Sequence, residues 1–322
     1  MPKGQRRPTA RPPRLDTPGS GFKPRGMTQA STPILSGLRE VADRYDVVLS
    51  DVWGVLHDGK RAFPGPAEAL ARFRQGGGTV VLITNAPRPN APIREQLDAF
   101  GVPRDAYDDI VTSGDSTVAL IAARGEGPFY HIGPERDRAL MDEVQARTGR
   151  RPALGALDEA AHVICSGLFD DRSETPDHYE ATYASMRERG VEMICANPDV
   201  VVHVGDQLIF CAGALAERYE ALGGTVLYAG KPHAPIYDLA LSLAARSRGR
   251  DVDPRRVLTV GDGMRTDVAG AVGQGLDCLF VTNGIHRDDT GPGDGTLDPA
   301  ALGRFLAAAP HRPAFAMPDL AW

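Results

Sequence analysis

The sequence has little of what marks extracellular, membrane or nucleic-acid-binding proteins. Its 322 residues include four scattered cysteines, none with metal-type spacing, which indicates buried thiols in a cytoplasmic protein rather than a disulfide framework. No apolar run exceeds the length of a strand, so we expect no membrane span. The formal net charge of −6 gives no reason to expect nucleic acid or an anionic membrane as a partner. The 42% hydrophobic content is that of a globular chain, and the length suggests about two domains.

The order of elements along the chain predicts an α/β protein. Residues 1–29 lack apolar periodicity and are rich in proline, glycine and basic residues, so we expect a disordered basic tail. Beyond them, apolar runs of strand type alternate with helical patterns, which is typical of a parallel sheet. Asp115 is expected to cap a helix over 116–123, and the proline-rich end after a helix over 297–308 is expected to be an extended surface segment.

Polar residues follow several of these predicted strands. Asp51 ends an apolar run and Gly54 turns the chain away, which places a carboxylate where ligands bind in open α/β sheets. Such an acid is otherwise a helix or turn cap, so Asp51 alone decides nothing. The other polar residues that lie at or just after predicted strand ends in this way are Thr84, Asn85, Lys231, Asp262 and Asp267.

Together these residues suit the attack of a carboxylate on a phosphoryl group. Asp262 and Asp267 offer hard oxygen ligands for Mg²⁺, which reduces the repulsion between the two reacting anions. Lys231 can neutralise developing charge. Donors at Thr84 and Asn85 can bind phosphate oxygens.

At these positions the sequence resembles the haloacid dehalogenase superfamily, and in particular its class IIA, the NagD-type and p-nitrophenyl-phosphatase-like enzymes. The resemblance covers nearly everything after residue 30. The motifs that carry it are Asp51-Val52-Trp53-Gly54-Val55-Leu56, Ile83-Thr84-Asn85, Gly230-Lys231-Pro232-His233-Ala234-Pro235-Ile236-Tyr237 and Gly261-Asp262-Gly263-Met264-Arg265-Thr266-Asp267, with Thr112-Ser113-Gly114 and Asn197-Pro198-Asp199 as further landmarks.

The resemblance implies a Rossmann-like core with a parallel sheet, formed by residues 30–124 and 226–322, and an inserted α/β cap over 125–225 that sets specificity. It implies that Asp51 is the nucleophile, that Lys231 steadies charge, and that Thr84 and Asn85 hold the phosphoryl group. His203 is a candidate substrate contact from the cap. The implied Mg²⁺ ligands are Asp51, the carbonyl of Trp53, Asp262 and Asp267. We therefore expect a phosphatase that acts on a small phosphorylated metabolite, and exposed cap surfaces suit a homodimer.

Trp53 departs from the family pattern. Phosphatases of the family carry a second aspartate here, which acts as general acid and base, whereas an indole N–H cannot exchange protons near neutral pH. Three outcomes stay open. His57, Asp58 or a cap group transfers the proton; the protein is a dehalogenase-like hydrolase, although that chemistry needs no Mg²⁺; or it binds a phosphorylated ligand with little turnover.

Overall fold

The structure is a computed structural model that describes residues 32–124, 127–204 and 207–322. The tail expected over 1–29 lies outside the described residues. Residues 32–322 form one compact unit. Among the described helices, none combines the length and apolar character that crossing a membrane requires.

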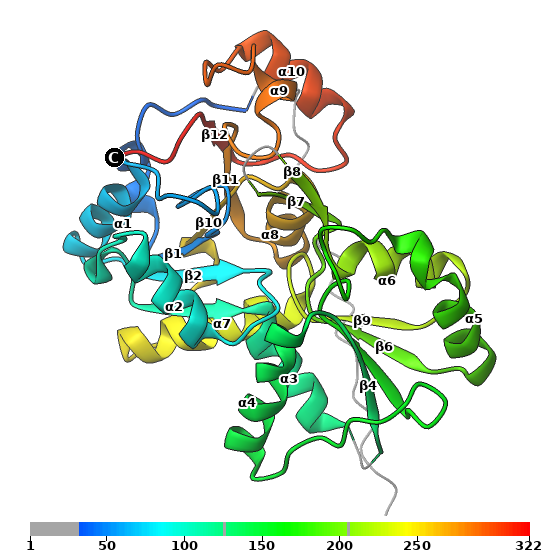
Figure 1. Ribbon diagram of the computed structural model, residues 1–322. Coiled ribbons are helices and arrows are strands. Elements are labelled where there is room, and N and C mark those ends of the chain that lie inside the picture. Colours follow the sequence, from blue (N-terminus) through cyan, green and yellow to red (C-terminus); the bar gives the residue numbers. More distant parts are fainter. Residues whose placement is uncertain (1–31, 125–126, 205–206) are drawn as a thin grey trace, which may run out of the picture. The chain divides into compact units, whose positions relative to one another are not determined.

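A six-stranded parallel sheet forms the core of this unit (Figure 1). Its strands are β1 (Val47–Ser50), β2 (Thr79–Thr84), β3 (Asp109–Thr112), β10 (Val257–Gly261), β11 (Asp277–Val281) and β12 (Phe315–Met317). They lie in the order β12-β11-β10-β1-β2-β3. Strands β1, β2 and β10 are buried along their whole length, which explains why they read as continuous apolar runs.

Helices pack on both faces of this sheet because successive residues of each strand point to opposite sides. Val48 of β1 packs in one hydrophobic core with Leu70 and Leu97, from α1 and α2. Its neighbour Leu49 packs in a second core with Ile236 of α7 and Leu302 of α10. The helices around the sheet are α1 (Pro66–Gln75), α2 (Asn90–Ala99), α7 (Ala234–Arg248), α8 (Ala269–Gln274), α9 (Arg287–Thr290) and α10 (Pro299–Ala308). Short 3₁₀ turns span Leu38–Glu40, Ala42–Arg44, Arg104–Ala106 and Pro254–Arg256, and a π-helical turn spans Met264–Val268.

The C-terminal segment is part of the core, and the expectation of an extended surface segment was wrong. Its strand β12 pairs in parallel with β11 at the edge of the sheet, and Phe315 and Met317 are buried. Leu320 beyond it is buried as well. Only three residues form this strand, between Pro313 and Pro318, so the apolar pattern is too short to reveal it.

A second parallel sheet lies in the middle of the chain. Its strands are β4 (Phe129–Ile132), β5 (His162–Cys165), β6 (Glu192–Cys195) and β9 (Val226–Tyr228), in that order. The helices packed with it are α3 (Ser113–Ala123), α4 (Ala139–Thr148), α5 (Glu180–Arg189) and α6 (Ala212–Ala221), and 3₁₀ turns at Glu135–Arg138 and Pro176–Tyr179 precede α4 and α5. An α/β unit inserted in an α/β core is the fold class that the sequence predicted. The last strand, β9, lies just beyond residue 225, and the exact domain limits stay a prediction.

An antiparallel hairpin follows this sheet's third strand. It consists of β7 (Val201–Val204) and β8 (Gln207–Phe210). The sequence did not predict β8, because its four residues are too few to distinguish a strand from a loop by their apolar pattern. His203 lies in β7 opposite Leu208, and its side chain lies outside the described part of the structure.

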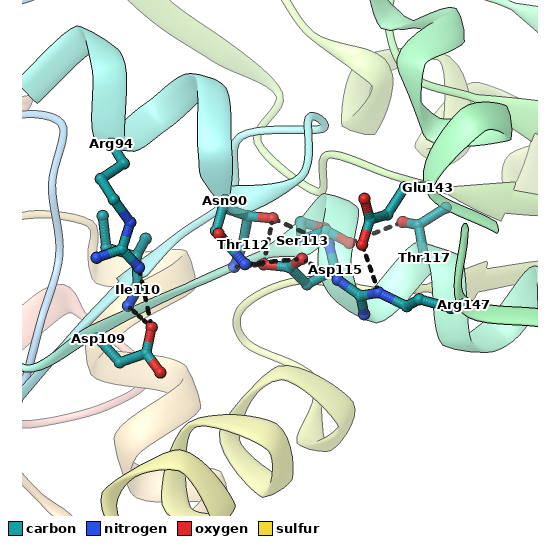
Figure 2. Close-up of polar contacts among 10 residues, drawn as sticks. All are labelled: Asn90, Arg94, Asp109, Ile110, Thr112, Ser113, Asp115, Thr117, Glu143 and Arg147. Carbon is teal, nitrogen blue, oxygen red and sulfur yellow. Dashed lines mark hydrogen bonds and ion pairs between the residues drawn. The ribbon is translucent and has the colours of Figure 1, made fainter. Parts of the chain in front are cut away.

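The start of α3 joins the two sheets. Thr112, the last residue of β3, is the N-cap, and Asp115 is the third helical residue rather than the cap that we expected. The Asp115 carboxylate accepts the Thr112 main-chain N–H (3.1 Å) and a 2.7 Å hydrogen bond from Arg147 of α4 (Figure 2). Asn90 of α2 donates to the same carboxylate at 3.3 Å. This buried carboxylate therefore fixes the point at which the chain leaves the first sheet for the second.

Candidate active site

The candidate nucleophile lies at the topological switch point of the six-stranded sheet. The chain runs from β1 to β2 and β3 on one side, and its later strands β10, β11 and β12 lie on the other. Asp51 directly follows β1 and donates its main-chain N–H to Val260 of β10 (2.7 Å). The switch point is where open α/β sheets bind ligands, so the fold itself delivers this carboxylate to a binding edge.

Three carboxylates meet at this edge. One oxygen from each of Asp51, Asp262 and Asp267 lies within 4.8 Å of the others, and all three residues are buried. Asp262 Oδ2 accepts the Ile285 N–H (2.8 Å). A Cβ built on Gly54 or Gly284 would lie 2.1 or 1.9 Å from the same oxygen, so both positions need glycine for the main chain to come this close.

Lys231 is the cation of the cluster. Its Nζ lies 2.7 Å from Asp51 Oδ1 and 2.8 Å from Asp267 Oδ1, and the residue is 2% exposed. Burial alone would lower the pKa of Lys231, but Asp267 and Asp51 raise the pKa well above its usual value, so the ammonium persists at neutral pH.

The carboxylates carry more negative charge than this one lysine balances. Burial, together with Asp267 and Asp262, raises the pKa of Asp51 well above its usual value although Lys231 opposes the shift. Burial and Asp267 raise the pKa of Asp262 to about 7. Such a crowded set of hard oxygens is what a divalent cation stabilises, and the residues present therefore fit one. Trp53 lines the same cavity, and the expected role of its carbonyl as a ligand stays a prediction.

Asn85 follows β2 and clamps the main chain of the lysine. Its Oδ1 accepts the Lys231 N–H (2.7 Å), and its Nδ2 donates to the Lys231 carbonyl (3.1 Å) and to Asp199 Oδ1 (2.8 Å). Both amide hydrogens are therefore engaged. The neighbouring Thr84 is also buried, and its hydroxyl accepts the Ala86 N–H at 3.3 Å. The roles expected for Thr84 and Asn85 in holding a phosphoryl group stay predictions.

A cavity of about 590 Å³ opens above this cluster. Its wall holds Asp51, Thr84, Asn85, Lys231, Asp262 and Asp267, which the sequence singled out, and also Trp53. The inserted unit contributes Asp199, Val201 and Val202. The sequence marked Asp199 only as part of a motif and gave it no role, since its contact with Asn85 joins residues 114 positions apart.

The surroundings of Trp53 show whether the nearby His57 can replace the general acid that is absent at position 53. The ring of His57 packs edge-on against Trp53 (centroids 5.2 Å apart) and against Phe100 (5.1 Å). His57 is 1% exposed, its Nδ1 accepts the Gly59 N–H (3.0 Å), and burial lowers its pKa to about 4. A neutral, enclosed ring with such a low pKa does not suit proton transfer to a substrate.

Asp58 is the second residue near Trp53 in the sequence that was a candidate for proton transfer. Its Oδ1 accepts the main-chain N–H groups of Lys60 and Arg61, both at 2.8 Å. Burial is the largest single effect and raises the pKa of Asp58, but these hydrogen bonds and the charge of Arg61 together outweigh it and hold the pKa below its usual value. Asp58 is thus a turn-stabilising carboxylate that stays ionised at neutral pH.

Comparisons with known proteins agree with this geometry. The family model for haloacid dehalogenase-like hydrolases matches residues 48–147, and a model described as HAD-hydrolase-like matches residues 228–321. The crystal structure of a haloacid dehalogenase-like hydrolase from Brucella suis 1330 is 44% identical, with a TM-score of 0.78, and the match covers 89% of this chain and 100% of that one. The chain belongs to the haloacid dehalogenase-like hydrolase family. It is therefore a hydrolase of this family, as the motifs predicted.

Curated relatives of this chain are more distant in sequence. Human chronophin is 27% identical over 78% of this chain and 86% of its own length. The ribonucleotide monophosphatase NagD of Escherichia coli K12 is 26% identical over 75% of this chain and 89% of its own length. The solved NagD structure superposes with a TM-score of 0.62. These class IIA relatives confirm the resemblance that the motifs indicated.

Proposed function

We propose that this protein is a Mg²⁺-dependent phosphatase that hydrolyses a small phosphorylated metabolite through an aspartyl phosphate on Asp51. The observation that carries the proposal is the position of Lys231 Nζ, which bridges Asp51 and Asp267 at 2.7 and 2.8 Å beside the third carboxylate, Asp262. A nucleophile, a fixed cation and further hard oxygens at one cavity suit the transfer of a phosphoryl group.

In this proposal each residue of the site has a distinct role. The Asp51 carboxylate attacks phosphorus, and Lys231 stabilises the charge on the phosphoryl oxygens. Thr84 donates its hydroxyl to one of those oxygens. The oxygens of Asp51, Asp262 and Asp267, with the Trp53 carbonyl, would hold the Mg²⁺ ion, which supplies charge neutralisation between the two anions.

The inserted unit would set the choice of metabolite. Its contribution to the cavity wall, Asp199, Val201 and Val202, is mixed in polarity. His203 belongs to the same strand as the two valines and remains a candidate substrate contact. A cytoplasmic location and a homodimer remain predictions.

The proposal rests on catalysis by Asp51, so the Asp51→Asn variant tests it. With Mg²⁺ present, the wild-type protein should hydrolyse p-nitrophenyl phosphate, and both excess EDTA and Asp51→Asn should abolish the reaction. Asp58→Asn is the matched control, because Asp58 lines the same cavity outside the carboxylate cluster, and it should keep most of the activity. Undiminished turnover by Asp51→Asn would contradict the mechanism. Release of halide from a haloacid without metal would instead indicate a dehalogenase, and binding without turnover would indicate a phospho-ligand binding protein.

A further inference from the structure

Hydrolysis of an unactivated phosphate ester needs a group that gives a proton to the leaving oxygen and then takes one from water. Trp53 occupies the position expected for that group and cannot exchange protons near neutral pH. His57 is enclosed by aromatic rings, and Asp58 is held as a carboxylate by the two N–H groups of its own turn. The proton-transfer group must therefore come from elsewhere on the cavity wall.

Most other ionisable groups on the described cavity wall are already committed. Asp51, Asp262 and Asp267 form the carboxylate cluster, and Lys231 is ion-paired with two of them. Asp288 is exposed at the surface, with 85% of its side chain accessible. Arg61 and Arg287 also line the wall, and a guanidinium group has hydrogen-bond donors but no acceptor. Asp199 is the remaining ionisable side chain of the described wall.

The backbone of Asp199 is held in place at both sides. It lies in the loop after β6, where its main-chain N–H donates to Asn197 Oδ1 (3.1 Å) and its carbonyl accepts the Gly213 N–H of α6 (3.0 Å). Its side-chain Oδ1 accepts the hydrogen bond from Asn85 Nδ2 (2.8 Å). Among the described residues, no further hydrogen bond reaches Oδ2. One carboxyl oxygen is therefore anchored, and the other is left for a ligand in the cavity.

The direction of the pKa shift of Asp199 suits a general acid. Burial raises its pKa above the usual value, Lys231 and the Asn85 hydrogen bond oppose the shift, and Asp267 adds to it. The other ionisable groups that interact with Asp199 are Asp262 on the first sheet and the thiols of Cys195 and Cys211. Both thiols have pKa values raised by burial, so they stay neutral and leave Lys231 as the main cation near Asp199.

We infer that Asp199, from the inserted unit, is the proton-transfer residue of this phosphatase in place of the aspartate that Trp53 replaces. The inference rests on the proposed function. In the first step the Asp51–phosphorus bond forms, the bond to the leaving oxygen breaks, and the Asp199 carboxyl gives its proton to that oxygen. In the second step the Asp199 carboxylate takes a proton from water as the water oxygen attacks phosphorus. The bond to Asp51 then breaks, which releases phosphate.

Asn85 is a positioning residue in this arrangement. The orientation of its amide is fixed, because a reversed amide would place its NH₂ group against the Lys231 N–H. The same side chain therefore orients the Asp199 carboxyl and the main chain of Lys231. A base or acid held by a third group in this way is a general feature of catalytic sites.

Two variants of Asp199 separate proton transfer from positioning. Asp199→Asn keeps an oxygen that can accept from Asn85 but cannot exchange protons, whereas Asp199→Ala loses both properties. The measured quantity is the ratio of kcat/KM for an alkyl phosphate to kcat/KM for p-nitrophenyl phosphate, with Mg²⁺. This ratio does not depend on how much of a variant is folded, and it reports the step in which the leaving oxygen departs.

We expect Asp199→Asn to lower this ratio by about 10²–10⁴-fold, because only the alkoxide needs a proton as it leaves. In the wild type, kcat/KM for the alkyl phosphate should fall as pH rises through the pKa of Asp199. The pH profile of Asp199→Asn should lack this fall. Restoring an acid with Trp53→Asp should recover the ratio in the Asp199→Asn background.

Four results would contradict the inference or the function on which it rests. An unchanged ratio in Asp199→Asn, with a loss only in Asp199→Ala, would mean that Asp199 only positions Asn85. A ratio lowered equally in the control Asp58→Asn would mean that the effect is not specific to Asp199. If the wild-type protein hydrolysed neither ester with Mg²⁺ present, the proposed function itself would be overturned. If the wild type is active but the ratio is unchanged in both Asp199 variants, only this inference is overturned.

Discussion

Replacing Asn85 by alanine removes three hydrogen bonds at once from the centre of the candidate site. The amide holds the N–H and the carbonyl of Lys231 at 2.7 and 3.1 Å and Asp199 Oδ1 at 2.8 Å. Asn85 and Lys231 are 3% and 2% exposed, so water does not readily replace the lost amide at the lysine main chain. The variant therefore leaves two buried main-chain groups unpaired.

The size of the effect follows from these contacts. Each buried group left without a partner costs about 1–3 kcal/mol, and Asp199 lies at the cavity wall where water can reach it. We therefore expect Asn85→Ala, which leaves two such groups unpaired, to lower the free energy of unfolding by roughly 2–6 kcal/mol. Loosening the lysine main chain also displaces its Nζ from the two carboxylates. We expect kcat to fall by about 10–100-fold, equivalent to about 1.4–2.7 kcal/mol in the barrier, with a smaller change in KM.

Urea denaturation followed by circular dichroism measures the first quantity, and initial rates on p-nitrophenyl phosphate measure the second. Asn90→Ala is the matched control, because Asn90 donates only two long hydrogen bonds, of 3.3 Å, to Asp115 at a distance from the cavity. It should lose less than about 1 kcal/mol and keep its kcat. Equal effects of the two substitutions would refute the clamp that we assign to Asn85.

Two further predictions concern the carboxylate cluster and the buried histidine. Gly284→Ala should weaken activation by Mg²⁺ more than about tenfold, since the added Cβ would lie 1.9 Å from Asp262 Oδ2. Gly303→Ala in α10 is the control: no atom lies within 4 Å of the added Cβ, so it should leave activity unchanged and raise the free energy of unfolding by about 0.5–1 kcal/mol. Mg²⁺ titrations of activity and urea denaturation measure the two effects. Equal Mg²⁺ dependence in the two variants would contradict the prediction for Gly284→Ala. The pKa of His57 is about 4 in the folded protein against 6.5 ordinarily, so the unfolded chain binds a proton that the folded one does not, and stability is lost as pH falls from about 6.5 to 4. His57→Asn, which keeps an acceptor for the Gly59 N–H, should reduce this slope by up to about 1.4 kcal/mol per pH unit, and an unchanged slope would contradict a buried neutral ring.

Local patterns predicted most of the fold, because strands buried on both faces read as unbroken apolar runs between glycine-rich turns. The strand β12 escaped because its three residues, Phe315–Met317, are too few for any periodicity. The strand β8 was missed for the same reason, since its four residues, Gln207–Phe210, show no clear period.

For the candidate site, the sequence pointed to residues at strand ends that line one cavity in the structure, but it could not supply the contacts between them. Parallel strands bring their carboxyl ends to one edge, which is why Asp51 and Asp262 meet there. The engagement of both Asn85 amide hydrogens, the enclosure of His57 and the position of Asp199 depend on packing between elements far apart in the chain. Because His57 is enclosed, Asp199 is the carboxyl that we propose for proton transfer at the cavity that Trp53 lines.

The central claim is that Asp51 carries the phosphoryl group during turnover. Rapid acid quenching of the protein with a ³²P-labelled phosphate ester and Mg²⁺, followed by peptide mapping, tests it directly. We predict label on the peptide that contains Asp51 in the wild type and none in Asp51→Asn. Turnover without label on that peptide, or label that persists in Asp51→Asn, would contradict the account.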